Sequence, residues 1–320
     1  MVTETQDKIY DVIVIGAGPG GMTAALYASR SDLSTLLIER GVPGGQLINT
    51  AEIENYAGFK SIKGPELANN MYEGATQFGA EYTFGDVHEI IDGKEYKQVV
   101  TNKEIFKARA VILATGAEHK KLGIPGESEL NGRGVSYCAV CDGAFFRDRP
   151  LVVVGGGDSA VEEGTYLTQF ASDVTIIHRR DELRAQNILQ DRAFNNDKVN
   201  FIWDTVVEEV EGENNVEALR LRNVKTNETS EIPIDGVFIY IGLLPNTTAF
   251  ENLGITDEEG WIITDTHMET SIPGIFAVGD VRKTVLRQVS TAVGDGSIAG
   301  DTAYKYVESL KEELALTKEA

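Results

Sequence analysis

The sequence predicts an α/β protein of two domains, the second inserted into the first. The chain has 320 residues, which is long enough for two separate hydrophobic cores. Its 33 glycines outnumber its 8 prolines, as expected where strands turn tightly into helices. The order strand, glycine turn, helix and strand also occurs twice along the chain. This internal duplication indicates two domains of the same type.

The first copy begins with an apolar strand before Gly16, continues with a helix near residues 20–30 and ends with a strand at residues 34–40. The second begins before Gly155, has a helix through about Phe170 and ends with a strand at residues 174–180. Gly16 and Glu39 are as far apart as Gly155 and His178, so the ends of the second strands correspond. Residues that differ between these two ends should therefore distinguish two ligands.

Each copy is followed by an apolar strand that ends in glycine, and we interpret these strands as exits from a domain. The pattern predicts that residues 1–116 and 247–320 form one discontinuous domain, with residues 117–246 inserted into it. Polar segments at residues 95–108 and 217–232 occupy equivalent places and should form exposed hairpins.

The first glycine turn has the spacing GxGxxG, with Gly16, Gly18 and Gly21 between a strand and a helix. Glycine lets the backbone approach a pyrophosphate, and the helix N-terminus offers unpaired N–H groups. Glu39 is placed to accept hydrogen bonds from a ribose diol and would repel a 2′-phosphate. This Rossmann-like unit suits FAD or NAD, and the alternative is a tight turn in an unrelated α/β domain.

The second glycine turn has the GxGxxA variant, with Gly155, Gly157 and Ala160, but no acid ends the following strand. His178, Arg179, Arg180 and, one turn later, Arg184 stand there instead. Guanidinium groups match a 2′-phosphate in bidentate geometry, so this copy favours NADPH over NADH. The alternative for these arginines is a solvated helix face.

Two nucleotide sites in one chain imply electron transfer between two cofactors, and FAD is the natural partner of NADPH. The segment at residues 270–280 fits this interpretation, because a strand that ends in Gly279 and Asp280 can present a carboxylate to the flavin ribityl chain. The alternative is an ordinary strand-to-turn transition.

Cys138 and Cys141 are the only cysteines, and at this spacing they can bind one metal ion or each other. A structural zinc site needs four ligands, and the four histidines include no H-x₃₋₅-H pair. The spacing therefore favours a redox-active pair over zinc, or over two cysteines that are close by chance. Asp142 follows directly and can supply or accept the proton that thiol–disulfide exchange must move.

The composition excludes several classes of function. A formal net charge of −21 would repel phosphate backbones and anionic lipid headgroups, so we expect no nucleic-acid or membrane partner. The polar N-terminus lacks a secretion signal, and no apolar run is long enough to span a bilayer. We therefore expect a cytoplasmic location, where a purely structural disulfide is rare.

Taken in order, the motifs GxGxxG, CAVCDG, GGGDSAVEE, HRRDELRA and AVGD resemble those of the low-molecular-weight bacterial thioredoxin reductases over nearly the whole chain. A CxxCDG motif just before the second glycine turn separates this family from glutathione reductases, whose cysteine pair lies in the FAD domain. The resemblance implies a homodimer with one FAD per subunit, an NADPH domain that carries the cysteines, and thioredoxin as substrate. It also implies a large rotation between the domains.

The resemblance further assigns residues to each site. For FAD they are Gly16, Gly18, Pro19, Gly21, Glu39, Arg40, Gly44, Gly45, Gln46, Leu47, Asn55, Val87, Gly279, Asp280, Arg287, Gln288 and Val289. For NADPH they are Gly155, Gly157, Asp158, Ser159, His178, Arg179, Arg180 and Arg184, and the catalytic residues are Cys138, Cys141 and Asp142. Arg133, Phe145 and Phe146 resemble a docking surface for thioredoxin, with core packing of the two phenylalanines as the alternative. Ala144 departs from the family, since some members have phenylalanine there.

Two other functions remain open. One is the reductase component of an alkyl hydroperoxide system, which normally carries an additional N-terminal thioredoxin-like region, whereas this chain reaches its first strand after a short polar segment. The other is a redox sensor that holds flavin without turnover, and the presence of Asp142 and both cysteines argues against it. The sequence leaves open which thiol faces the flavin, although adjacency to Asp142 favours Cys141.

Overall fold

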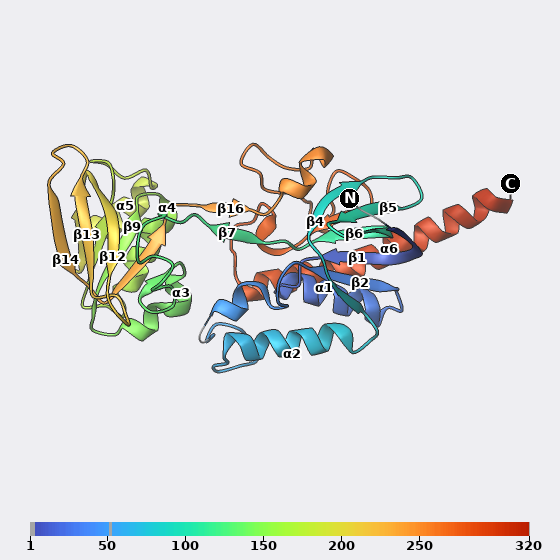
Figure 1. Ribbon diagram of the computed structural model, residues 1–320, viewed down its shortest axis with the longest axis horizontal. Coiled ribbons are helices and arrows are strands. Elements are labelled where there is room, and N and C mark those ends of the chain that lie inside the picture. The colour runs from blue at the N-terminus through green and yellow to red at the C-terminus, as the bar shows by residue number, and fades with distance from the viewer. Residues whose placement is uncertain (1–3, 51–52, 320) are drawn as a thin grey trace. The chain divides into compact units, whose positions relative to one another are not determined.

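The computed structural model describes residues 4–50 and 53–319 (Figure 1). The chain divides into two compact units, the first formed by residues Met1–Glu118 and Leu244–Ala320 and the second by His119–Leu243. The sequence predicts the domain boundaries after residues 116 and 246, a few residues from these positions. Both units are α/β with parallel central sheets, which confirms the predicted fold class.

The sheet of the first unit has the strand order β3-β2-β1-β6-β5-β4, and β17 also pairs with β6. Strands β1, β2, β3, β17 and the second half of β6 are parallel, and the central positions of all but the edge strand β3 are almost fully buried. This explains their continuous apolar runs, since helices or loops cover both faces of the sheet. The strands are β1 Glu4–Ile15, β2 Thr35–Glu39, β3 Glu81–Phe84, β4 Val87–Ile91, β5 Lys97–Thr101, β6 Glu104–Leu113 and β17 Ile275–Ala277.

Strand β6 joins two features that the sequence had presented as separate. Its first half pairs with β5 as the predicted antiparallel hairpin, with Val100 opposite Ile105. Its second half continues into the central sheet, where Val111 lies opposite Ile275 of β17. One long strand therefore links the exposed hairpin to the nucleotide-binding sheet.

In the part of the chain that the structure describes, three helices cover this sheet: α1 Pro19–Arg30, α2 Gly64–Thr76 and α6 Val289–Glu319. Helices α1 and α2 lie on the same face of the sheet (Figure 1). Helices α1 and α6 pack closely because α6 presents glycine to α1: a Cβ on Gly296 would lie 2.3 Å from the Gly20 carbonyl oxygen. Short 3₁₀ turns are η1 Gly45–Asn49, η3 Thr248–Leu253 and η4 Gly279–Val281.

The second unit repeats the parallel arrangement, with the strand order β11-β10-β9-β15-β8. A separate antiparallel sheet, β12-β13-β14, contains the hairpin predicted at residues 217–232. The strands are β8 Val135–Ser136, β9 Pro150–Gly155, β10 Asp173–Ile177, β11 Val199–Ile202, β12 Thr205–Glu211, β13 Ala218–Asn223, β14 Thr229–Pro233 and β15 Gly236–Tyr240. The helical elements are α3 Ala139–Asp142, η2 Gly143–Phe146, α4 Asp158–Leu167 and α5 Asn187–Phe194.

Some predicted boundaries were wrong by a few residues. Strand β10 ends at Ile177 and not at Arg180, so the basic residues that follow lie on a loop. Helix α4 ends at Leu167 and not at Phe170. Strand β17 ends at Ala277 and not at Asp280. Gly279 and Asp280 belong to the turn η4. In each case the residues at the polar or glycine-containing end of the predicted element lie outside the regular strand or helix.

The two crossings between the units run as short strands, β7 Ala117–His119 and β16 Leu243–Pro245, which pair with each other. Beside β7, Gly116 has φ +67°, and beside β16, Gly242 has φ +123°. At the first unit's end of the crossings, the Thr115 hydroxyl donates to the Asn246 carbonyl at 2.7 Å. No helix among the described residues is long and apolar enough to cross a membrane.

Candidate functional site

The turn between β1 and α1 needs glycine for two different reasons. Gly16 has φ +103°, and a Cβ there would lie 2.4 Å from the Ala114 carbonyl oxygen. A Cβ on Gly21 would lie 1.9 Å from the Gly16 oxygen. At Gly18, the N-cap of α1, a Cβ would meet no protein atom within 4 Å. Open backbone at a helix N-terminus, with Pro19 as the first helical residue, fits a phosphate group.

Glu39 ends β2 and closes this turn through its carboxylate. One oxygen accepts the Ala17 N–H at 2.7 Å and the other accepts the Gly41 N–H at 2.8 Å. A carboxylate has about four acceptor positions, so hydrogen bonds to a ribose diol remain available. Glu39 therefore orders the turn and still fits the predicted contact with a ribose.

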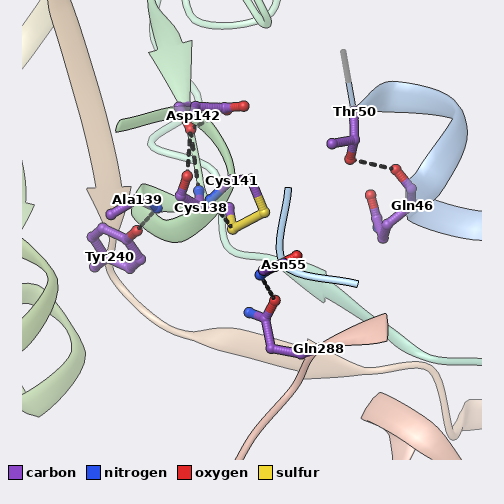
Figure 2. The surroundings of a disulfide bond; sticks show 10 residues. Gln46, Thr50, Asn55, Cys138, Ala139, Cys141, Asp142, Tyr240 and Gln288 are labelled. Carbon is purple, nitrogen blue, oxygen red and sulfur yellow. Dashed lines mark hydrogen bonds between the residues drawn. A yellow bond between two sulfur atoms is a disulfide. The ribbon is translucent and has the colours of Figure 1, made fainter. Parts of the chain in front are cut away.

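The turn η1 lies against the same glycine turn. The Gly44 N–H donates to the Ala17 carbonyl at 2.7 Å, and a Cβ on Gly45 would come within 3.1 Å of the Gly18 Cα. Leu47 is the buried residue of η1. Gln46 is exposed, and its carbonyl accepts the Thr50 hydroxyl at 3.1 Å (Figure 2).

The C-terminal part of the first unit reaches the same place. A Cβ on Gly20 would lie 3.1 Å from the Ala292 carbonyl of α6 and 3.2 Å from Val278, the residue before η4. Burial raises the pKa of Asp280 to about 6, although the nearby Arg287 opposes this shift. The Arg287 guanidinium lies 3.9 Å from the ring centre of Trp261, a contact that the sequence did not suggest.

The remaining residues predicted for FAD are placed individually. The Asn55 amide donates to Gln288 at 2.9 Å, immediately before Val289 begins α6 (Figure 2). The Gly85 N–H donates to the Glu39 carbonyl at 3.0 Å, which brings the start of β4 at Val87 close to the end of β2. Arg40 is exposed and forms a 2.7 Å ion pair with Glu118.

The turn between β9 and α4 repeats the first turn in the second unit. Gly155 has φ +153°, and a Cβ there would lie 2.4 Å from the Tyr240 carbonyl oxygen. Gly157, the N-cap of α4, has no protein atom within 4 Å of an added Cβ. A Cβ on Gly156 would lie 2.4 Å from the His178 ring, so this imidazole packs directly on the turn. The open N-terminus of α4 again fits a phosphate.

The loop after β10, residues 178–186, is fixed to this turn; we call it the arginine loop. The Arg184 N–H donates to the Gly156 carbonyl at 2.7 Å. The Asp158 carboxylate accepts the Gln186 backbone N–H at 2.7 Å and its side-chain amide at 2.8 Å, and these bonds lower the pKa of Asp158. Asp158 thus holds the loop, a role that the sequence did not suggest.

The charged groups of the arginine loop remain available at the surface. Arg179, Arg180 and Arg184 are exposed, as is Ser159 at the start of α4, whereas His178 is buried. Burial and the three arginines lower the pKa of His178, and its Nε2 atom has no hydrogen-bond partner among the described residues. Three exposed guanidinium groups beside a helix N-terminus fit a 2′-phosphate.

Cys138 and Cys141 form a disulfide at the start of α3, in the second unit (Figure 2). The Cys138 sulfur accepts the Cys141 N–H at 3.2 Å. The Ser136 hydroxyl accepts the Cys138 N–H at 3.1 Å and donates to Asp142 at 2.6 Å. Burial raises the pKa of Asp142, while the Ser136 hydrogen bond opposes this shift. A half-buried carboxyl group therefore lies beside the disulfide.

A further contact to this loop comes from the end of β15. The Tyr240 hydroxyl accepts the Ala139 N–H at 2.6 Å (Figure 2). Ser136 and Tyr240 were missed by the sequence analysis, because no local motif links them to the cysteines. Within residues 4–50 and 53–319, no three His, Cys, Asp or Glu side chains are grouped as a metal site would require.

The residues predicted to dock a partner have different environments. Phe145 is 49% exposed, whereas Phe146 packs edge-to-face on Phe238 with ring centres 5.7 Å apart. Arg133 is exposed and donates to the Glu129 carbonyl. Core packing was the alternative to a docking role for both phenylalanines. Phe146 packs in the core, whereas Phe145 does not.

Comparison with known proteins agrees with this geometry. The model of the pyridine nucleotide-disulphide oxidoreductase family matches residues 10–296. Thioredoxin reductase from Listeria monocytogenes is 65% identical over 311 residues, which cover 97% of this chain and 98% of that protein. Thioredoxin reductase from Bacillus subtilis is 63% identical over 315 residues, or 98% of this chain and 100% of that protein.

A solved structure is also similar. Thioredoxin reductase from Streptococcus pyogenes superposes with a TM-score of 0.90 at 59% identity and covers 95% of this chain and all of that one. The family implies a flavin and a nicotinamide cofactor, consistent with the two open helix N-termini. From its two glycine turns, its cysteine pair and these relatives, the chain belongs to the pyridine nucleotide-disulphide oxidoreductase family and, within it, to the thioredoxin reductases.

Proposed function

We propose that this protein transfers electrons from NADPH through FAD to the Cys138–Cys141 disulfide, and from there to oxidised thioredoxin. The observation that carries the proposal is the disulfide at the start of α3, with the carboxyl group of Asp142 beside it. The relatives from Listeria monocytogenes and Bacillus subtilis, both thioredoxin reductases, support thioredoxin as the substrate.

We assign FAD to the first unit and NADPH to the second. In the first, the N-terminus of α1 at Gly18 would hold the pyrophosphate, and Glu39 the adenosine ribose. In the second, the N-terminus of α4 would hold the NADPH pyrophosphate, and the arginine loop its 2′-phosphate. The flavin, when bound, supplies transfer of an electron pair between the nicotinamide and the disulfide.

The chemistry at the cysteines balances in two stages. Reduction adds two electrons and two protons to the disulfide and gives two thiols. One thiolate then attacks a sulfur of the substrate disulfide and releases the other substrate sulfur, forming a mixed disulfide. The second cysteine attacks this bond, restores Cys138–Cys141 and releases the reduced substrate. In this scheme Asp142 holds a proton for the sulfur that leaves.

We also propose a homodimer that acts in the cytoplasm, as the resemblance implies. Because the disulfide lies in the second unit and the flavin site is assigned to the first, the second unit must rotate to present its disulfide and its nicotinamide in turn. Exposed Phe145 and Arg133 are the residues that we assign to thioredoxin docking.

The test is a coupled assay with the flavin-loaded protein, NADPH, thioredoxin and a chromogenic disulfide. We expect turnover that requires all four components. Cys141→Ser should abolish it while oxidation of NADPH by a one-electron acceptor continues, because the acceptor takes electrons without the cysteines. No turnover with any thioredoxin would remove this substrate, and loss of both activities in Cys141→Ser would indicate a defect in flavin binding.

A further inference from the structure

Lys225 connects the arginine loop to a hairpin of the antiparallel sheet. The residue lies in the turn between β13 and β14, and its ammonium group donates to the Asp181 carboxylate at 2.8 Å. The same ammonium group lies 3.0 Å from the Asp204 carboxylate. Asp181 follows Arg180 directly in the arginine loop, whereas Asp204 lies between β11 and β12. One lysine therefore joins three separate segments of the second unit.

Main-chain hydrogen bonds reinforce this junction. The Asp204 N–H donates to the Arg180 carbonyl at 3.2 Å, and the Asp204 carbonyl accepts the Val224 N–H at 2.6 Å. The Thr205 N–H donates to the His178 carbonyl at 3.1 Å. An exposed ion pair between two flexible side chains contributes little to stability. Here, however, the Asp204 side chain is only 18% exposed and holds the ammonium group beside the loop.

The position of Asp181 is unfavourable for a loop that binds phosphate. Arg179, Arg180 and Arg184 lie in the same loop, and guanidinium groups pair with carboxylates in the same bidentate geometry as with phosphate. A free Asp181 would compete with a 2′-phosphate for these arginines, and its negative charge would repel the phosphate. In the described part of the chain, Asp181 forms its ion pair with Lys225 and none with the three arginines.

We propose that Lys225 is a positioning residue for nucleotide selectivity, which binds Asp181 and Asp204 and so keeps the arginine loop free for the 2′-phosphate of NADPH. The proposal deepens the proposed function, since it rests on the assignment of the 2′-phosphate to this loop. NADPH and NADH differ only in that phosphate. Loss of Lys225 should therefore weaken the binding of NADPH and spare that of NADH.

The test measures, by titration calorimetry, how adenosine 2′,5′-bisphosphate binds to the oxidised, flavin-loaded protein. This probe carries the 2′-phosphate and needs no turnover. We expect Lys225→Ala to weaken its binding about three- to tenfold, because Asp181 is then released toward the arginines. Lys225→Arg keeps a cation that can pair with both carboxylates, so its affinity should stay within about twofold of the wild type.

Steady-state oxidation of each nucleotide by a one-electron acceptor gives a second readout. In Lys225→Ala the KM for NADPH should rise about three- to tenfold while kcat stays within about twofold, because the lysine affects binding and not hydride transfer. The KM for NADH should stay within about twofold of the wild type. An equal rise in KM for both nucleotides would overturn the proposal.

Asp181→Asn separates positioning from a direct contact. If Lys225 acts by occupying Asp181, removal of that carboxylate makes the lysine unnecessary. Lys225→Ala combined with Asp181→Asn should then bind the bisphosphate within about twofold of Asp181→Asn alone. If Lys225 contacted the 2′-phosphate itself, Lys225→Ala would cost about three- to tenfold in either background, and this result would overturn the proposal.

Lys305→Ala is the matched control, since Lys305 forms an exposed 2.6 Å ion pair with Asp301 on α6, and it should leave the affinity for the bisphosphate unchanged. An unchanged affinity in Lys225→Ala would also overturn the proposal. The calorimetry uses neither thioredoxin nor the cysteines. A negative result therefore leaves the proposed disulfide reduction intact, and failure of the coupled assay leaves this result intact.

Discussion

At the scale of single residues, the environment of Asp142 is a balance of two effects. Burial raises its pKa, and the hydrogen bond from the Ser136 hydroxyl, 2.6 Å from Asp142, lowers it. Ser136 also accepts the Cys138 N–H at 3.1 Å. This serine therefore connects the backbone of the first cysteine with the carboxyl group proposed to move the proton.

Ser136→Ala should raise the pKa of Asp142 further, because the carboxylate loses its hydrogen-bond donor while burial remains. If Asp142 supplies a proton, it works in its protonated form, so activity persists to higher pH. We expect the alkaline limb of kcat/KM for disulfide reduction to move up by about one pH unit. The measurement is the pH profile with thioredoxin held well below KM.

Ser172→Ala is the matched control for this substitution, since Ser172 donates a 2.9 Å hydrogen bond to the neighbouring Asp173 at an exposed position. Its pH profile should match that of the wild type. An alkaline limb that stays in place or moves to lower pH in Ser136→Ala would show that Asp142 does not donate the proton.

At the scale of elements, the two glycine turns combine strained and open positions. Gly16 and Gly155 have positive φ. A Cβ added to either residue would lie 2.4 Å from a main-chain oxygen atom, so the fold requires glycine there. A Cβ added to Gly18 or Gly157 would meet no protein atom within 4 Å, so the fold does not require glycine at these two positions. Glycine at the open positions is explained by the close approach of a ligand.

Gly18→Ala should therefore separate flavin binding from folding. We expect the flavin-free protein to unfold at nearly the wild-type temperature and its affinity for FAD to fall about tenfold or more, because a methyl group would occupy the path of the pyrophosphate. Gly16→Ala should instead lower the unfolding temperature. The measurements are thermal unfolding without flavin and titration with FAD.

Gly74→Ala, in the last turn of α2, is the control and should leave FAD affinity unchanged. Unchanged FAD affinity in Gly18→Ala would argue against a pyrophosphate at the N-terminus of α1. The same pair of measurements on Gly157→Ala, with NADPH as ligand, applies to α4.

The arginine loop allows a test of nucleotide preference. Arg179→Ala combined with Arg180→Ala should lower kcat/KM for NADPH about 100-fold or more and change that for NADH less than twofold, because two charge-assisted contacts to the 2′-phosphate are lost. Steady-state kinetics with each nucleotide measures this. Arg220→Ala, on β13, is the control. An equal loss with both nucleotides would place the arginines elsewhere than at the 2′-phosphate.

At the scale of the whole molecule, the chain passes between the two units at the crossings that contain β7 and β16. Each crossing has a glycine in a backbone conformation that other residues adopt with strain, Gly116 at φ +67° and Gly242 at φ +123°. These positions suit a hinge, because glycine can pass between conformations that a side chain would forbid.

Gly116→Ala combined with Gly242→Ala should slow the complete reaction more than it slows either half-reaction, the reduction of the flavin or its reoxidation. A Cβ at positive φ costs about 1–2 kcal/mol per residue, so the two substitutions together can change the balance between two domain arrangements by about 30-fold to several hundredfold. We expect kcat with thioredoxin to fall by a factor in that range, while FAD and NADPH affinities stay within about twofold. Stopped-flow kinetics of flavin reduction and reoxidation measures this. Unchanged kcat would show that these glycines do not limit the rotation.

Much of the candidate site was predictable because its parts are local in sequence. The turns at Gly16 and Gly155 depend on glycines only a few residues apart, and Cys138 and Cys141 are separated by one turn of chain. The structure added the contacts between distant segments. These are the hydrogen bonds of Tyr240 with Ala139 and of Gln186 with Asp158, and the cation–π contact of Arg287 with Trp261. Single-sequence patterns carry no information about such pairs.

The sequence by itself determined the fold class, the two nucleotide-binding units and the chemistry of the cysteine pair, because turns, helix starts and thiol spacing depend on neighbouring residues. Only the tertiary structure decided which groups surround that pair. The fold brings Ser136 to Asp142 and Tyr240 to Ala139, where they form hydrogen bonds, and it packs α4 against α3. Burial and charge at these contacts depend on that packing, and they set the proton affinities on which disulfide reduction depends.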